Sequence, residues 1–173
     1  MNASAPHGLD VLGEGVATAR DLSGARTPRR TSVYADPVSW LVLEAVERAV
    51  EAYGGDLRAV RDSVGHIAVS DHCTAHTMRE LAATIPAGRV SPLRFSGANP
   101  GSVCGLPAQL LGFGGPSLTL SMPPEKGLAP AVAVARVWLA QGTAGHVLLT
   151  THRADASGHR VTSTILRETQ REG

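Results

Sequence analysis

The chain has 173 residues, which fits a single domain with its own hydrophobic core. Its 16 basic and 15 acidic residues leave a net charge of +1, so there is no long-range positive field to attract nucleic acid or an anionic lipid surface. Apolar residues make up 43% of the chain but aromatic residues only 3%, so Ala, Val, Leu and Gly must fill the core.

The cysteine content and the length of the apolar runs indicate where in the cell the protein is located. Cys73 and Cys104 are too few for a disulfide framework, and no segment of signal-peptide type precedes them. The longest apolar run falls short of the roughly 20 residues that cross a bilayer. We therefore expect a cytoplasmic protein with reduced thiols and no membrane contact.

The first half of the chain predicts, in order, a strand, a helix, a strand and a helix: 9–19, 37–53, 64–70 and 74–85. Gly13 and Gly15 interrupt the first strand, which is typical of a bulge. Asp36 followed by Pro37 is a strong signal for a helix start, because Asp caps the first amides and proline needs no hydrogen bond there. Pro86 is expected to end the second helix.

The second half predicts a loop, a helix, a strand, a helix and two strands: 91–101, 102–111, 117–122, 127–141, 147–151 and 160–166. Pro107 makes the first of these helices short or kinked. Alternating strands and helices indicate an α/β sheet with helices on both faces. We expect one domain over 1–173, flexible at 1–8 and 20–34, where periodicity is absent.

Four motifs in the second half occur in a recognisable order: Ser91-Pro-Leu-Arg-Phe-Ser-Gly-Ala-Asn, Gly115-Pro-Ser-Leu-Thr-Leu, Ala140-Gln-Gly and Val147-Leu-Leu-Thr-Thr. Their order and spacing resemble the N-terminal half of the β-ketoacyl synthase family. The resemblance implies half of a thiolase-like fold, with a central mixed β-sheet and helices packed on its faces.

The same resemblance places the family's nucleophile at a residue that lacks one. In the family, the Gly-Pro-Ser-Leu-Thr strand leads to a sharp turn with the catalytic cysteine nine residues after the first glycine, and counting from Gly115 gives Pro124. A thiolate is needed there to attack the acyl thioester. The family's two catalytic histidines lie in its other half. We therefore expect no catalytic residue in this chain and no cofactor.

The resemblance also implies partners. Family members dimerise through the strand that leads to the cysteine, and here that strand and its turn comprise Ser117, Leu118, Thr119, Leu120, Ser121 and Met122. Family subunits that lack the cysteine are known as chain-length factors of type II polyketide systems. The expected partners are a complete ketosynthase and an acyl carrier protein, with a second copy of the chain as an alternative.

One further group of residues suggests different chemistry. His72 and His76 would lie on one face if both were helical, and Asp71 or Cys73 would add a third metal ligand. His152 follows a strand at its carboxyl end, where α/β proteins place ligand groups, although a surface role is the simpler interpretation. The alternatives are therefore a metal-assisted hydrolase or acyl transferase using Asp71, His72, His76 and His152, or a homo-oligomeric scaffold. Our interpretation assigns no bound metal.

Overall fold

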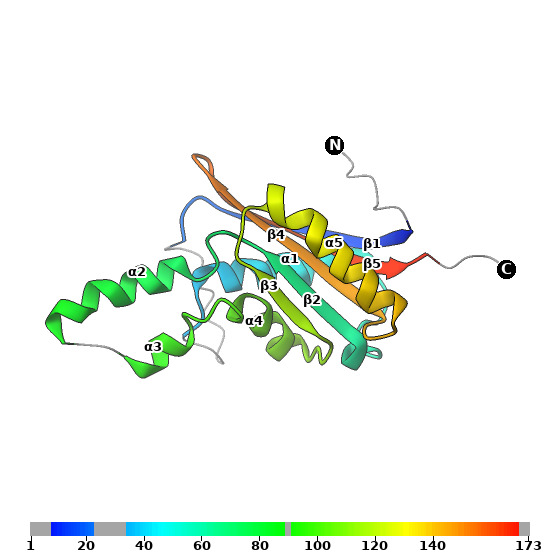
Figure 1. Cartoon of the computed structure of the whole chain (residues 1–173), viewed down its shortest axis with the longest axis horizontal. Coiled ribbons are helices and arrows are strands. Elements are labelled where there is room, and N and C mark those ends of the chain that lie inside the picture. The colour runs from blue at the N-terminus through cyan, green and yellow to red at the C-terminus, as the bar shows by residue number, and fades with distance from the viewer. Residues whose placement is uncertain (1–7, 23–33, 89–90, 170–173) are drawn as a thin grey trace.

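A computed structural model describes residues 8–22, 34–88 and 91–169. Its five strands form one sheet in the order β1-β5-β4-β2-β3, as Figure 1 shows. Strands β1, β5 and β4 are antiparallel neighbours, whereas β4, β2 and β3 are parallel, so the sheet is mixed as predicted. The strands are β1 Leu9–Ala19, β2 Val64–Val69, β3 Ser117–Leu120, β4 His146–Asp155 and β5 Gly158–Glu168.

Helix α1 (Pro37–Tyr53) forms as the sequence predicts. The Asp36 carboxylate accepts a hydrogen bond from the Val38 amide at 2.9 Å, and Gly54 ends the helix with φ of 64°, a conformation that glycine adopts without strain. The helix lies so close to β1 that a side chain at Gly15 would collide with the backbone of Ala45. The glycine in this strand is therefore explained by close backbone packing.

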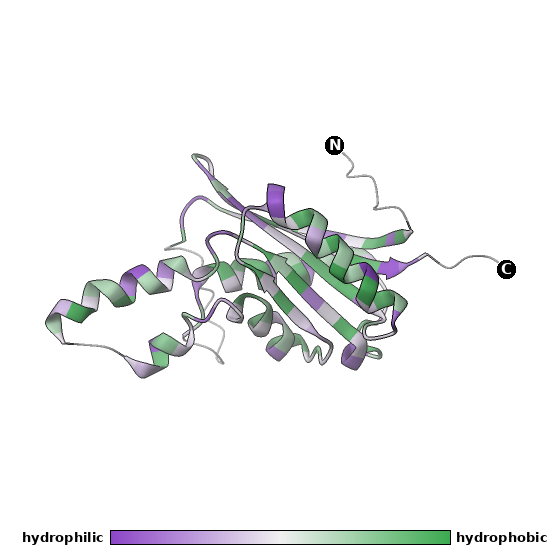
Figure 2. Cartoon of the chain, viewed as in Figure 1, coloured by the Kyte–Doolittle hydropathy of each residue, from purple (hydrophilic) through white to green (hydrophobic). Residues whose placement is uncertain are grey.

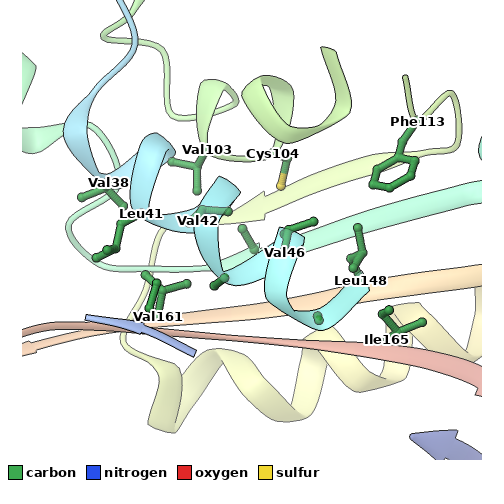
Figure 3. Packing of buried hydrophobic residues seen from close by; sticks show 14 of the residues in the cluster. Val38, Leu41, Val42, Val46, Val103, Cys104, Phe113, Leu148, Val161 and Ile165 are labelled. Atoms are coloured by element: carbon green, nitrogen blue, oxygen red, sulfur yellow. The ribbon is translucent and has the colours of Figure 1, made fainter. Parts of the chain in front are cut away.

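The two faces of the sheet are covered by different helices. Helices α1 and α4 (Ser102–Leu111) pack on one face, and α5 (Pro124–Ala140) packs on the other, where it stands in front of β4 and β2 in Figure 1. Figure 3 shows the first interface, where Val42 and Val46 of α1 meet Leu148 of β4 and Val161 of β5. Alternate residues of each strand point to opposite faces, so Val147 and Leu149 pack under α5 instead.

Helix α2 (Ala75–Thr84), the short turn 85–87 and helix α3 (Pro92–Ser96) project from the body of the molecule, at the left of Figure 1. The prediction of a loop over 91–101 is partly wrong, because α3 forms there. The Ser91 hydroxyl accepts a hydrogen bond from the Arg94 amide at 3.4 Å, and Pro92 suits the first helical position. Sequence periodicity cannot detect a helix of five residues.

The other element predictions hold with shifted boundaries. Helix α5 begins at Pro124, three residues before the predicted start, and β4 and β5 extend into a hairpin with Asp155 opposite Gly158. The segment expected to be flexible over 20–34 lies outside the described residues except at 20–22 and 34, and so does 1–7 of the first flexible segment. Within the described ranges no helix is long and apolar enough to span a membrane.

Candidate functional site

The carboxyl ends of the parallel strands β2, β3 and β4 lie at one edge of the sheet, where open α/β folds usually bind ligands. Three features of the chain meet here: the turn from β3 into α5, the loop from β2 into α2, and the far end of the β4–β5 hairpin. Of the site residues predicted from the sequence, Asp71, His72 and His152 lie in these segments and Pro124 is the first residue of α5 after the turn, whereas Ser117–Leu120 form β3 and His76 lies in the first turn of α2.

The turn from β3 into α5 leads to Pro124, the residue to which the sequence resemblance assigned the nucleophile position. Strand β3 ends at Leu120, Pro123 is the N-cap of α5 in an extended conformation, and Pro124 is its first, buried residue. Proline provides neither a nucleophilic atom nor an amide proton at this position. The next residue, Glu125, is exposed and forms an ion pair with Arg153 of β4. The geometry is a strand, a turn and a helix, without a reactive group at the helix start.

The predicted interface segment follows the edge of the sheet. Residues Ser117–Leu120 form β3, the outermost strand beyond β2, and Ser121 and Met122 lie in the turn that follows. The amide of Ser70 donates to Leu120 O at 3.1 Å and that of His66 to Pro116 O at 2.9 Å. Because backbone groups alternate in direction along a strand, the amide of Thr119 points away from β2. This edge is thus available for a further strand.

The loop from β2 into α2 contains a buried thiol. Cys73 has φ of 40°, the only described non-glycine residue with positive φ. Its sulfur donates to Ser70 O at 3.0 Å and lies 3.5 Å from the Ser121 hydroxyl, and the side chain packs in the core beneath α1. Cys104 of α4 is buried as expected, and burial raises the pKa of its thiol to about 11. Both cysteines are buried, and neither lies at the start of α5.

Three histidines from separate segments come together at the end of the sheet. The ring centres of His72, His152 and His159 are 5.2 to 5.9 Å apart, and we call these three residues the imidazole cluster. His72 lies in the β2–α2 loop, His152 on β4 and His159 on β5. The interpretation of His152 as a surface residue is wrong: the side chain is 1% exposed, because β4 continues past Thr151 and directs it under the α1 side of the sheet.

A hydrogen-bond chain fixes the protons of this cluster. The buried Ser70 hydroxyl oxygen accepts from the amides of His72 at 3.2 Å and Cys73 at 2.9 Å, so its own proton donates to Nδ1 of His152 at 2.8 Å. The proton of His152 is then on Nε2, which donates to Nδ1 of His159 at 3.0 Å. The neutral His159 ring therefore carries its proton on Nε2, which is left as a donor.

The electrostatic environment keeps His152 and His159 neutral near pH 7. Burial, followed by the charge of its histidine neighbours, lowers the pKa of His152 from 6.5 to about 4. Burial also lowers the pKa of His159, and positive charge on His72 and His76 lowers it further. For Asp71 the charged form is favoured instead. The hydrogen bond from His72, at 2.7 Å, holds the pKa of the Asp71 carboxyl below its usual value.

The metal geometry considered as an alternative is not found among the described residues. His72 precedes α2, which begins at Ala75, so His72 and His76 do not share a helix face as the spacing suggested. His76 instead pairs with Glu80, at 3.2 Å. In the part of the chain that the structure describes, no group of three or more His, Cys, Asp or Glu side chains is arranged to hold a metal ion.

Sequence reasoning missed several polar residues of this region. His159 and Ser70 belong to the chain described above, and a second buried chain joins Nε2 of His66 to Thr150, and Thr150 to Ser163, with distances of 2.9 Å each. The hairpin register gave a usable signal, because His152 and His159 lie diagonally on one face of β4 and β5. The partner of His66 depends on the pairing of β2 with β4, which are more than 70 residues apart in sequence.

Comparison with known proteins identifies the fold. No family model matches the sequence, and no curated protein matches it. Among solved structures, the ishigamide ketosynthase/chain length factor is similar with a TM-score of 0.74 and 15% identity, over 93% of this chain and 62% of that chain. A type II PKS acyl-carrier protein in complex with its ketosynthase (AntDE:AntF) matches with a TM-score of 0.70 and 16% identity, over 94% and 62%.

A ketosynthase (ApeO) in complex with its chain length factor (ApeC) from Xenorhabdus doucetiae matches with a TM-score of 0.66 and 11% identity, over 95% of this chain and 80% of that chain. The chain therefore has a thiolase-like fold of the ketosynthase type. It spans 62% of the length of each of the first two chains.

Proposed function

We propose that this protein is a non-catalytic ketosynthase-like subunit that associates with a complete ketosynthase in polyketide or fatty-acid-type biosynthesis, where it stabilises the partner or shapes its acyl pocket. The observation that carries the proposal is Pro124 at the first position of α5, where the family resemblance puts a nucleophilic cysteine. With no nucleophile at this junction, an acyl-enzyme cannot form there.

Two surfaces support the association. The outer edge of β3 is open to a further strand, and α5 leaves Leu128 and Val137 more than 40% exposed on the sheet face that only this helix covers among the described residues. Apolar side chains on such a face are the kind of surface that a protein partner covers. Solved structures with this fold include ketosynthases in complex with a chain length factor or an acyl-carrier protein.

The test is co-expression with a complete ketosynthase encoded nearby, followed by size-exclusion chromatography and a condensation assay with its acyl carrier protein. A stable heteromer and higher condensation activity in the presence of this chain are expected. The Thr119→Pro variant should lose the complex, because proline removes the outward amide of β3 but leaves the bonds to β2 in place. Thr119→Ser keeps that amide and serves as the matched control.

A second experiment addresses catalysis directly. The purified chain is incubated with an acyl thioester donor and examined by intact-protein mass spectrometry, and no covalent acyl adduct is expected. Acylation of the chain by itself would contradict the proposal. A self-associated chain that neither binds a ketosynthase nor changes its activity would favour a homo-oligomeric scaffold instead.

A further inference from the structure

An open pocket of about 580 Å³ lies beside the imidazole cluster. Its wall is built from the segment after β1, from the start of α2 and from the β4–β5 hairpin. Five nitrogen-bearing side chains from these segments and from the β2–α2 loop line it: Arg20, His72, His76, Arg79 and His159. The volume is within the range of small-molecule sites in proteins.

The carboxylates of the same wall are already engaged. Asp155 accepts hydrogen bonds from the amide of Ser157 at 2.7 Å and from its hydroxyl at 2.6 Å, and Asp21 has an interaction partner as well. Arg20 and Arg79, by contrast, form no ion pair with any carboxylate among the residues that the structure describes. Two guanidinium groups in the wall are therefore available to a ligand.

The proton positions in the cluster add a neutral donor. The chain from Ser70 through His152 leaves the proton of His159 on Nε2, and His159 lines the pocket. His72 and His76 line the same pocket, and the ring centres of His72 and His159 are 5.9 Å apart.

We propose that this pocket binds the phosphate group of a small phosphate monoester, with Arg20 and Arg79 as charge partners and His159 as a hydrogen-bond donor. A phosphate monoester offers three acceptor oxygens and a charge of about −1.5 to −2, which two guanidinium groups and a neutral donor match. A carboxylate has two oxygens, which one guanidinium group satisfies. The rest of the pocket accommodates the organic part of the ligand. The proposal does not depend on the association with a ketosynthase.

The experiment is a calorimetric titration of the whole chain at pH 7 and constant ionic strength, first with inorganic phosphate and then with glycerol phosphate. Both are expected to bind, the monoester more tightly. Arg20→Gln and Arg79→Gln should each weaken phosphate binding about tenfold, which is the usual loss for a charge-assisted hydrogen bond. Arg153→Gln is the matched control, because Arg153 pairs with Glu125 and does not line the pocket.

Three results would overturn the proposal. The first is no binding at about 10 mM phosphate, a concentration that detects millimolar dissociation constants. The second is that chloride binds as tightly as phosphate at the same concentration. The third is that Arg153→Gln weakens phosphate binding as much as the Arg20 and Arg79 variants do. Far-ultraviolet circular dichroism of each variant shows whether it is folded. If Arg79→Gln fails to fold, Arg20→Gln and a His159→Phe variant carry the test. An intact ketosynthase complex without phosphate binding would contradict this inference alone.

Discussion

Helices α1 and α5 both have 17 residues, but they differ in how much of each helix is buried. Helix α1 buries ten residues, and charged residues such as Arg48 and Glu51 occupy its outer side. Helix α5 buries five, at the narrow spacing of Pro124, Gly127, Ala131, Ala135 and Leu139.

The outer side of α5 is largely apolar after the first turn, as the hydropathy colours in Figure 2 show. Leu128 and Val137 are 43% and 49% exposed there. A solvent-facing helix normally carries charged residues on its outer side. The difference between α1 and α5 teaches that α1 completes the core of this chain, whereas α5 has an apolar side that is not used within the described residues. This supports the proposal that a partner covers it.

The largest effect is expected at the interface of α1 with the sheet. In Gly15→Val, the new side chain would collide with the backbone of Ala45 and Ala49 and push α1 off β1. We expect a loss of more than about 3 kcal/mol in the free energy of unfolding, measured by urea denaturation. Gly105→Ala is the control, because nothing lies near its new methyl group and alanine favours helix. A Gly15→Val protein as stable as the parent would disprove the close packing of this face.

The second largest effect is expected from acidic pH, which should lower the free energy of unfolding through two histidines on the α1 face of the sheet. The folded-state pKa values of His66 and His152 are lowered from 6.5 to about 4, chiefly by burial. The unfolded chain therefore binds protons that the folded chain excludes, so stability is full above pH 6.5 and falls as the pH drops towards 4. The loss is on the order of 3 kcal/mol for each histidine.

Urea midpoints between pH 8 and pH 4 measure this loss, and His152→Gln should flatten the curve because glutamine does not titrate. A parent protein with pH-independent midpoints over this range would show that the histidines are not buried in neutral form. Both histidines lie on the α1 face: His66 is opposite Leu148, which packs under α1, and His152 follows four positions later on the same face of β4.

On α5, the substitution Val137→Asp should affect partner binding rather than the stability of the chain. Because Val137 is half exposed, the substitution should change the free energy of unfolding of the isolated chain by no more than about 0.5 kcal/mol. Co-purification with a ketosynthase partner should nevertheless be lost, because a carboxylate would enter an apolar contact. Val46→Asp on α1, where the side chain is fully buried, should unfold the chain. Retained co-purification with Val137→Asp would place the partner elsewhere.

The smallest effect is expected for the ion pair between Glu125 and Arg153, which links the start of α5 to β4. Both side chains are more than half exposed, so water screens the pair. Glu125→Gln should lower the melting temperature by an amount that corresponds to less than about 1 kcal/mol. A larger loss would mean that this ion pair, rather than the buried residues of α5, attaches the helix to the sheet.

Local signals in the sequence predicted most of the elements. Asp36, Pro37 and Gly54 marked both ends of α1, because capping and turn preferences depend on neighbouring residues only. The position of Pro124 also followed from counting along the chain. The short helix α3 was missed, since five residues contain little more than one helical turn. Helix α5 begins three residues before its predicted start, and β4 ends four residues after its predicted end.

The sequence by itself thus determined the fold class, the order of the elements and the absence of a nucleophile at the start of α5. Only the tertiary structure decided which polar residues meet. His72, His152 and His159 are brought together by the pairing of β2 with β4 and by the β4–β5 hairpin register, and Arg20 lines the adjacent pocket from the segment after β1. These contacts join segments far apart in the chain, and their geometry depends on strand pairing and burial, which local propensities do not encode.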